Sequence, residues 1–239
     1  MSARCSAEPR PAPRERAGGV TILVIDAALA HGTVAIVGHA GVQAARSLVG
    51  GRGHSTALAP AVVAVLEEAC VTLAALDGIA VTTGPGSFTG LRASIALAQG
   101  LAAASGLPLV GVSVAEALAA ALQELHGRTL WVATLSRRDR IFLHRDGGTG
   151  PVPLDALPPA DGPLAIAGDA AIAVAARLAA RGDDVRLTDA RYPDAVAIAT
   201  VAATRLHDGA PRPTVLPLYI DAPEARLPAG GLRPAPISL

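Results

Sequence analysis

Apolar runs separated by turn-forming residues dominate the first part of the chain. The runs 20–25, 33–37 and 42–48 are joined by short links, and they predict three strands of an antiparallel meander. Residues 55–70 are rich in apolar residues, and they predict a helix.

A strand, a glycine-rich loop, a helix and a second strand follow. The run 78–82 predicts a buried strand and the run 109–112 another, with apolar residues at helical spacing between them. Such a unit is typical of parallel strands joined by a right-handed crossover. Meander, helix, strand, helix, strand is the element order of the ribonuclease-H-like or actin-like α/β fold.

The second half predicts a smaller set of elements. These are a helix at 114–125, a hairpin of 130–135 and 140–143, a Pro/Gly-rich connection at 147–162, a strand at 164–167, and helices at 170–180 and 195–206. Actin-like proteins carry two related halves, and we place the boundary near residues 111–114. The predicted organisation is a disordered tail at 1–19, subdomains at 20–112 and 113–210, and an extended tail with seven prolines at 211–239.

The loop between the predicted parallel strands could bind an anion. Gly84, Gly86 and Gly90 permit unusual backbone angles, and Ser87 or Thr89 can cap the helix that follows. Backbone amides at a helix N-terminus favour a phosphate or a carboxylate. The alternative interpretation is a tight strand-to-helix connection with a good cap.

Composition excludes several kinds of chemistry. The formal net charge is zero, so any role with RNA is expected to run through a partner. All 20 basic residues are Arg and the chain has no Lys, which excludes a phosphate-loop or Schiff-base lysine. Cys5 and Cys70 do not suggest a disulfide, no secretory signal follows Met1, and the uncharged stretch 93–115 is broken by Gly and Pro. We therefore expect a cytoplasmic protein without a membrane span.

Metal-dependent and nucleophilic catalysis find no support in residue spacing. No two of the six histidines have the i, i+4 spacing that places two ligands on one helix face. The segment 86–90 resembles a nucleophile elbow, but Pro85 stands where the first glycine of that motif belongs. We predict no metal site and no catalytic residue.

The loop and its surroundings resemble the bacterial TsaB (YeaZ) family. The resemblance rests on the runs 76–81 and 84–92, continues through 100–102, 108–113 and 116–118, and includes shorter matches at 25–26, 54–55, 168–170, 217–219 and 222–223. Members of that family are partners of the enzyme TsaD in making threonylcarbamoyladenosine in tRNA. The resemblance implies an actin-like (ASKHA, ribonuclease-H-like) fold over roughly residues 20–227.

Asp26 follows the first predicted strand. In actin-like phosphotransferases an acidic residue at this place helps to hold metal-nucleotide, whereas the alternative here is a carboxylate that caps a turn. TsaB relatives usually show Thr-Ser after this aspartate, and this chain has Ala27-Ala28. The loss of both hydroxyls weakens a nucleotide site.

Two helices are the candidate partner interface. The helix at 55–70 carries more apolar residues than one core-facing stripe requires, and TsaB relatives use it with the next helix to pair with TsaD or with a second copy. The alternative is a helix enclosed by its own fold. His54 matches a family His-Ser-Glu motif, with Thr56 replacing the glutamate. The predicted interface residues are His54, Ala57, Leu58, Ala61, Val62, Val65, Leu91, Arg92, Ile95, Ala98 and Ala102.

The resemblance implies a non-catalytic subunit of the complex that makes threonylcarbamoyladenosine. TsaD would be the direct partner and TsaE would join through the complex, tRNA would be contacted only indirectly, and a homodimer is possible. No cofactor of its own is expected, although ATP or ADP could lie at the interface with the partner. The alternatives are an independent actin-like kinase or ATPase and, with less support, a metallopeptidase.

Overall fold

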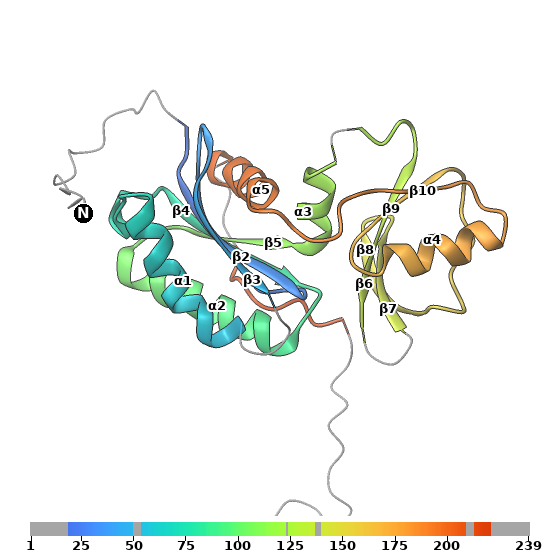
Figure 1. The fold of residues 1–239 in the computed structure, drawn as a ribbon, viewed down its shortest axis with the longest axis horizontal. Coiled ribbons are helices and arrows are strands. Elements are labelled where there is room, and N and C mark those ends of the chain that lie inside the picture. Colours follow the sequence, from blue (N-terminus) through green and yellow to red (C-terminus); the bar gives the residue numbers. More distant parts are fainter. Residues whose placement is uncertain (1–18, 50–53, 123, 137–139, 209–212, 221–239) are drawn as a thin grey trace, which may run out of the picture.

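The computed structural model describes residues 19–49, 54–122, 124–136, 140–208 and 213–220. In the described part, two five-stranded sheets lie beside each other, and helices cover their faces (Figure 1). The predicted disordered tail, apart from residue 19, and most of the predicted Pro-rich tail lie outside these ranges.

The first sheet has the strand order β3-β2-β1-β4-β5. The strand β1 is antiparallel to β2 and parallel to β4, and β5 continues the parallel side. The strands are β1 (Ile22–Asp26), β2 (His31–Gly38), β3 (Gly41–Val49), β4 (Gly78–Gly84) and β5 (Leu109–Ser113).

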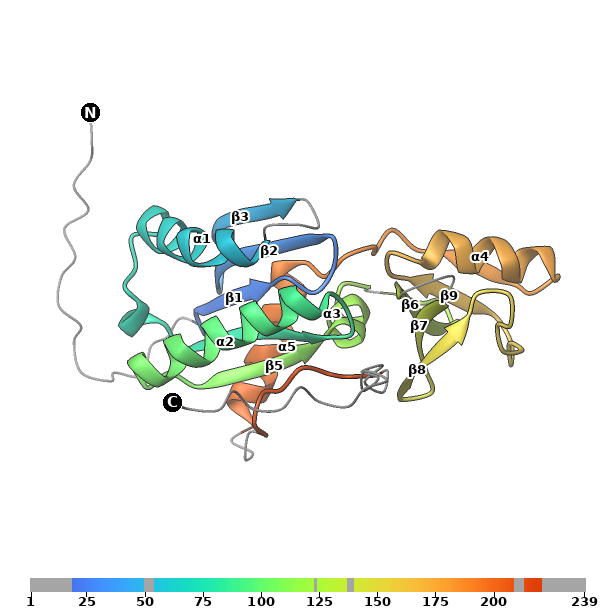
Figure 2. The ribbon, with the colours of Figure 1, turned by 90° about the horizontal axis from the view of Figure 1, so that it is seen from below.

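Helices cover both faces of this sheet (Figure 2). On one face lie α1 (His54–Glu68) and α2 (Phe88–Ser105), and on the other lies α5 (Ala195–His207). Alternate residues of β1 point to the two faces of the sheet and pack in the core on each face, as expected for a strand buried on both sides. Leu23 and Ile25 belong to the core under α1 and α2, whereas Ile22 and Val24 belong to the core under α5.

The second sheet has the strand order β10-β9-β6-β7-β8. Here β6 is antiparallel to β7 and parallel to β9, so the strands repeat the topology of the first sheet. The elements are β6 (Thr129–Leu135), β7 (Arg140–Arg145), β8 (Gly148–Pro153), β9 (Leu164–Ala167), α4 (Ala171–Ala180) and β10 (Val185–Leu187). The predicted pair of related halves is therefore visible in the strand orders.

The connections of the second half depart from the prediction. The expected Pro/Gly-rich connection at 147–162 contains the strand β8, and the short strand β10 was not expected. The helix expected at 114–125 is shorter: α3 (Val114–Ala120) is followed by its C-cap at Ala121. A capping box between Ser113 and Glu116 fixes its start.

The C-terminal helix returns to the first sheet. Ile198 and Ala202 of α5 pack in the same core as Ile22 and Val24 of β1, although α5 falls in the range 113–210 predicted for the second subdomain. Arg205 of α5 also pairs with Glu116 of α3. The predicted subdomain boundaries stay a prediction, and the last helix packs in the first half.

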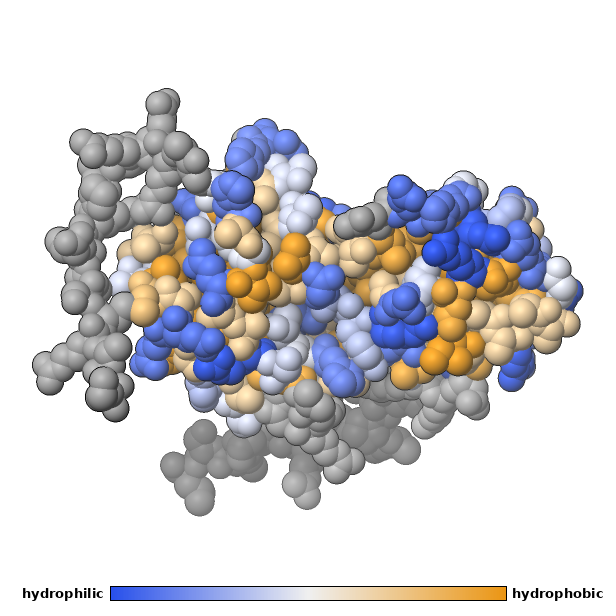
Figure 3. Space-filling view, turned by 45° about the horizontal axis from the view of Figure 1, so that its top comes forward, coloured by the Kyte–Doolittle hydropathy of each residue, from blue (hydrophilic) through white to orange (hydrophobic). Residues whose placement is uncertain are grey.

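Among the described residues, no helix is long and apolar enough to cross a membrane. On the face in Figure 3, hydrophobic groups are interrupted by hydrophilic residues.

Candidate functional site

Asp26 ends β1 and is completely buried. Its Oδ1 accepts hydrogen bonds from the Thr82 hydroxyl of β4 at 2.6 Å and from the Ala28 amide at 3.0 Å. Its Oδ2 has no hydrogen-bond partner among the described residues. Burial raises the pKa of this carboxyl to about 6, although the bonds from Thr82 and Ala28 work in the opposite direction. Asp26 therefore holds the end of β1 to β4 instead of facing an open cleft.

The glycine loop is closed by the link between β1 and β2. The Ser87 amide donates to the Ala28 carbonyl at 2.7 Å, so that one loop amide is already bonded. A Cβ on Gly86 would lie 2.0 Å from the Ala28 oxygen, and one on Gly90 would lie 2.2 Å from the Ala27 oxygen. Glycine is required at both positions because the backbone of the neighbouring link approaches so closely.

The other loop residues support the helix start. Ser87 is the N-cap of α2, and its hydroxyl accepts from the Gly90 amide at 3.2 Å. Gly84 is buried with φ +109, a conformation that favours glycine, and Thr89 is exposed in the first turn. The geometry corresponds to the tight, well-capped connection that was the alternative to an anion site.

The second half repeats this arrangement. The Ala170 amide donates to the Ala133 carbonyl of β6, and a Cβ on Gly168 would lie 2.1 Å from that oxygen. Asp169 Oδ1 accepts from the Leu135 amide at 2.8 Å at the end of β6. Burial raises the pKa of the Asp169 carboxyl, and the Leu135 bond opposes this. The Asp169 carboxylate thus satisfies the backbone amide at the end of β6.

The region between the halves is filled by apolar side chains. Leu29 follows β1, Leu91 begins α2, Leu118 belongs to α3 and Val132 belongs to β6, and all four are buried in one cluster. The pocket of about 490 Å³ lies beside this cluster, since its lining includes Leu122, Ala190 and Tyr192, which pack against it, but neither this pocket nor the one of about 420 Å³ is lined by Asp26 or the loop 84–90.

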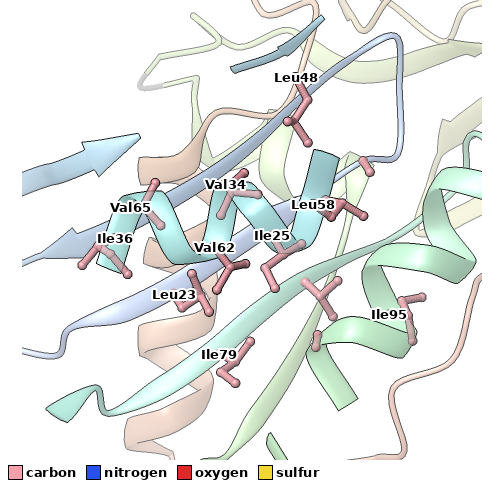
Figure 4. Packing of buried hydrophobic residues seen from close by; sticks show 14 of the residues in the cluster. Leu23, Ile25, Val34, Ile36, Leu48, Leu58, Val62, Val65, Ile79 and Ile95 are labelled. Carbon is pink, nitrogen blue, oxygen red and sulfur yellow. The ribbon is translucent and has the colours of Figure 1, made fainter. Parts of the chain in front are cut away.

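Most predicted interface residues face the chain's own core (Figure 4). Val62 of α1 lies among Leu23 and Ile25 of β1 and is 4% exposed, and Ile95 of α2 points into the same cluster. The same inward orientation is shared by Leu58, Ala61, Val65, Leu91 and Ala98, while Ala57 and Ala102 are half-buried. These side chains pack against the chain's own sheet, which is the alternative of a helix enclosed by its own fold, so their direct contact with a partner stays an untested prediction.

The outward faces of both helices consist of other residues. On α1 these include Ala59, Pro60 and Val63, the last 55% exposed. On α2 they include Arg92 and Ala96. His54 begins α1, and its side chain lies outside what the structure describes. The pair of helices stays a predicted interface, carried by these outer residues.

Two exposed aromatic residues beside Arg92 were missed. Phe88 begins α2, and Tyr219 lies in the C-terminal segment 213–220 that packs on α2. The sequence offered one signal for these two residues, namely that aromatic residues are rare and make up only 2% of the chain. Their proximity could not be inferred, because Arg92 and Tyr219 are 127 positions apart.

The described residues contain no group of three or more His, Cys, Asp or Glu that could hold a metal ion. The repeated sheet topology, with a buried carboxylate at the end of the first strand, defines an α/β protein of the actin-like (ASKHA, ribonuclease-H-like) fold.

Comparison with known proteins shows what the chain is similar to. The family model described as TsaD, tRNA N6-adenosine threonylcarbamoyltransferase, matches residues 47–149. The Escherichia coli protein TsaB, described as a tRNA threonylcarbamoyladenosine biosynthesis protein, is 35% identical over 117 residues, which is 49% of this chain and 50% of that protein. An uncharacterised Mycobacterium tuberculosis protein is 39% identical over 121 residues, or 50% of this chain and 56% of that protein. The chain thus spans about half the length of these curated relatives.

A solved structure extends the similarity over most of the fold. YeaZ from Pseudomonas aeruginosa aligns with a TM-score of 0.68 at 27% identity, covering 84% of this chain and 99% of that one. The chain is therefore similar to TsaB over about half of its length and to YeaZ over most of its fold.

Proposed function

We propose that this chain is a non-catalytic subunit of the machinery that makes threonylcarbamoyladenosine in tRNA, and that it binds and activates the enzyme TsaD. The similarity to TsaB and to the TsaD family model supports the pathway. The observation that carries the non-catalytic role is the apolar filling between the halves, where Leu29, Leu91, Leu118 and Val132 are buried together and leave no opening to Asp26.

The state of Asp26 agrees with this role. A carboxylate that holds metal-nucleotide must present its oxygens to the ligand, but Oδ1 of Asp26 is bonded to Thr82 and Ala28 and the whole side chain is buried. The chain thus contributes a rigid surface, and the reacting groups belong to the partner. We infer that it needs no cofactor, and that any ATP or ADP would lie at the interface with TsaD.

Depletion of the chain in its own cells tests the role in the pathway. We expect threonylcarbamoyladenosine in tRNA to fall and to return when the chain is supplied again, as measured by nucleoside analysis. Unchanged levels would contradict the proposal.

Assays with purified proteins separate the activation role from the kinase alternative. The isolated chain should not hydrolyse ATP, whereas its addition to TsaD and the other pathway components should increase the yield of modified tRNA. Turnover of ATP by the isolated chain would favour an independent ATPase instead.

A further inference from the structure

Phe88, Arg92 and Tyr219 form one exposed cluster at the start of α2. The guanidinium carbon of Arg92 lies 3.7 Å from the centroid of the Phe88 ring and 5.7 Å from that of Tyr219. Its Nε donates a hydrogen bond of 2.9 Å to the Tyr219 hydroxyl. Phe88 and Tyr219 are 51% and 57% exposed, although each is one of only two residues of its type in the chain.

The C-terminal segment holds this cluster in place. Val215 is buried in the core of the first half, and its carbonyl accepts from Gln99 of α2 at 2.9 Å. The Leu218 amide donates to the Thr83 carbonyl of β4 at 2.7 Å. Tyr219 therefore follows an anchored backbone, and little conformational entropy remains to be lost when a ligand binds the cluster.

The segment adds further apolar surface to the cluster. Leu216 and Leu218 are 63% and 40% exposed. Four of the ten exposed large hydrophobic residues in the described part of the chain are thus Phe88, Leu216, Leu218 and Tyr219. We name the set of Phe88, Arg92, Leu216, Leu218 and Tyr219 the tail–helix surface.

Arg92 lacks a carboxylate partner among the described residues, whereas Arg46, Arg128, Arg145, Arg181 and Arg205 each have one. Its Nε bond and the aromatic rings orient the planar guanidinium, which leaves the two terminal nitrogens to donate to a planar anion. Arginine and tyrosine in an apolar surround are typical of the energetically dominant residues of protein interfaces.

We propose that the tail–helix surface docks a segment of the partner enzyme that presents an aspartate or glutamate among apolar side chains. The carboxylate would bind the terminal nitrogens of Arg92, and its apolar neighbours would pack on Phe88, Leu216 and Leu218. This inference rests on the proposed function, since it places one anchor of the interface with TsaD. It adds to the outer faces of α1 and α2 a contact made by the C-terminal segment.

A protein fits this surface better than RNA does. Stacking between two aromatic rings suits a base, but a nucleic-acid site also needs several cations along the backbone. The cluster contains one arginine, and the whole chain has no net charge.

The test measures affinity of the full-length chain for purified cognate TsaD by calorimetry. Arg92→Ala should weaken binding at least about tenfold and reduce its dependence on salt, as expected for a charged anchor residue. Arg92→Lys should recover only part of the loss, because the ammonium lacks the planar fork. Arg177→Ala, an exposed arginine of α4, is the matched control and should bind like the unaltered chain.

The outcomes separate this inference from the proposed function. If the unaltered chain does not bind TsaD, both are wrong; if it binds and Arg92→Ala changes affinity less than twofold, only the tail–helix surface is wrong. The inference is also overturned if Arg92→Ala leaves TsaD binding intact and weakens binding of an anticodon stem-loop RNA or self-association of the chain. Thermal unfolding of each variant shows whether a loss of affinity reflects a loss of fold.

Discussion

The Thr82 hydroxyl donates a 2.6 Å hydrogen bond to Oδ1 of Asp26, and the two buried side chains join the ends of the parallel strands β1 and β4. Ionisation of a carboxyl in this position costs free energy, because the side chain is buried and one of its oxygens has no hydrogen-bond partner in the described part of the chain. Asp26 is therefore a structural group whose protonation should affect stability more than activity.

The pH dependence of stability should report Asp26. Burial raises its pKa from 3.8 to about 6, so the folded chain holds the proton more tightly than the unfolded chain. The protonated Asp26 carboxyl therefore contributes to the free energy of unfolding fully below about pH 4, and this contribution is lost as the pH rises through about 6. The loss is on the order of 3 kcal/mol, from about 1.4 kcal/mol for each pH unit.

Asp26→Asn isolates this contribution. The amide oxygen can still accept from Thr82 and Ala28, and no charge needs to be buried. Between pH 4.5 and pH 7.5, the free energy of unfolding measured in urea should decrease less for Asp26→Asn than for the unaltered chain. Asp155→Asn, at an exposed site, is the control. An identical decrease in Asp26→Asn and the unaltered chain would contradict this assignment.

The glycines of α2 should respond in opposite directions to alanine. A Cβ on Gly90 would lie 2.2 Å from the Ala27 oxygen, so Gly90→Ala must displace backbone and should cost at least about 2 kcal/mol. Gly100 has nothing within 4 Å, so Gly100→Ala should stabilise the helix by about 0.5–1 kcal/mol. Free energies of unfolding measured in urea compare the pair. If Gly100→Ala lowers the free energy of unfolding as much as Gly90→Ala does, the close approach of the Ala27 oxygen to Gly90 is not the cause of the loss.

The central architecture could be predicted because its signals are local. Buried strands such as β1 and β4 are continuous apolar runs, and the loop 84–90 combines glycines with a capping serine. The edge strands of the second sheet could not be predicted in the same way. The strand β8 carries Pro151 and Pro153, and β10 has only three residues, so neither shows an apolar period.

The site residues were harder to predict because direction and distant contacts are tertiary properties. The spacing of Leu58, Val62 and Val65 marks one face of a helix, but the sheet beneath decides that this face is internal. The contact between Arg92 and Tyr219 depends on the path of the C-terminal segment. The interface on α1 and α2 therefore stays a prediction, in which Arg92 is exposed and Val62 and Ile95 are buried.

Adjacent valines of α1 should separate folding from partner binding. Val62 is buried among Leu23 and Ile25, so Val62→Asp would bury an unpaired carboxylate and should unfold the chain. Val63 is 55% exposed, so Val63→Asp should stay folded. If the outer face of α1 contacts TsaD, Val63→Asp should weaken that binding at least about tenfold.

Circular dichroism and a pull-down with TsaD measure the two effects. Thr56→Asp, an exposed substitution in the first turn of α1, is a second probe of the same helix face. A folded Val63→Asp variant that binds TsaD normally would remove α1 from the interface.

Magnesium-ATP should not stabilise the isolated chain. Asp26 is completely buried beside the region filled by Leu29, Leu91, Leu118 and Val132, so a nucleotide could reach its carboxylate only by displacing packed side chains. A ligand present at 100 times its Kd adds about 2.7 kcal/mol to the free energy of unfolding, which raises the Tm by several degrees. We expect 1 mM magnesium-ATP to leave the Tm unchanged in a thermal scan. A rise of several degrees would require the halves to open, and would return the independent ATPase to consideration.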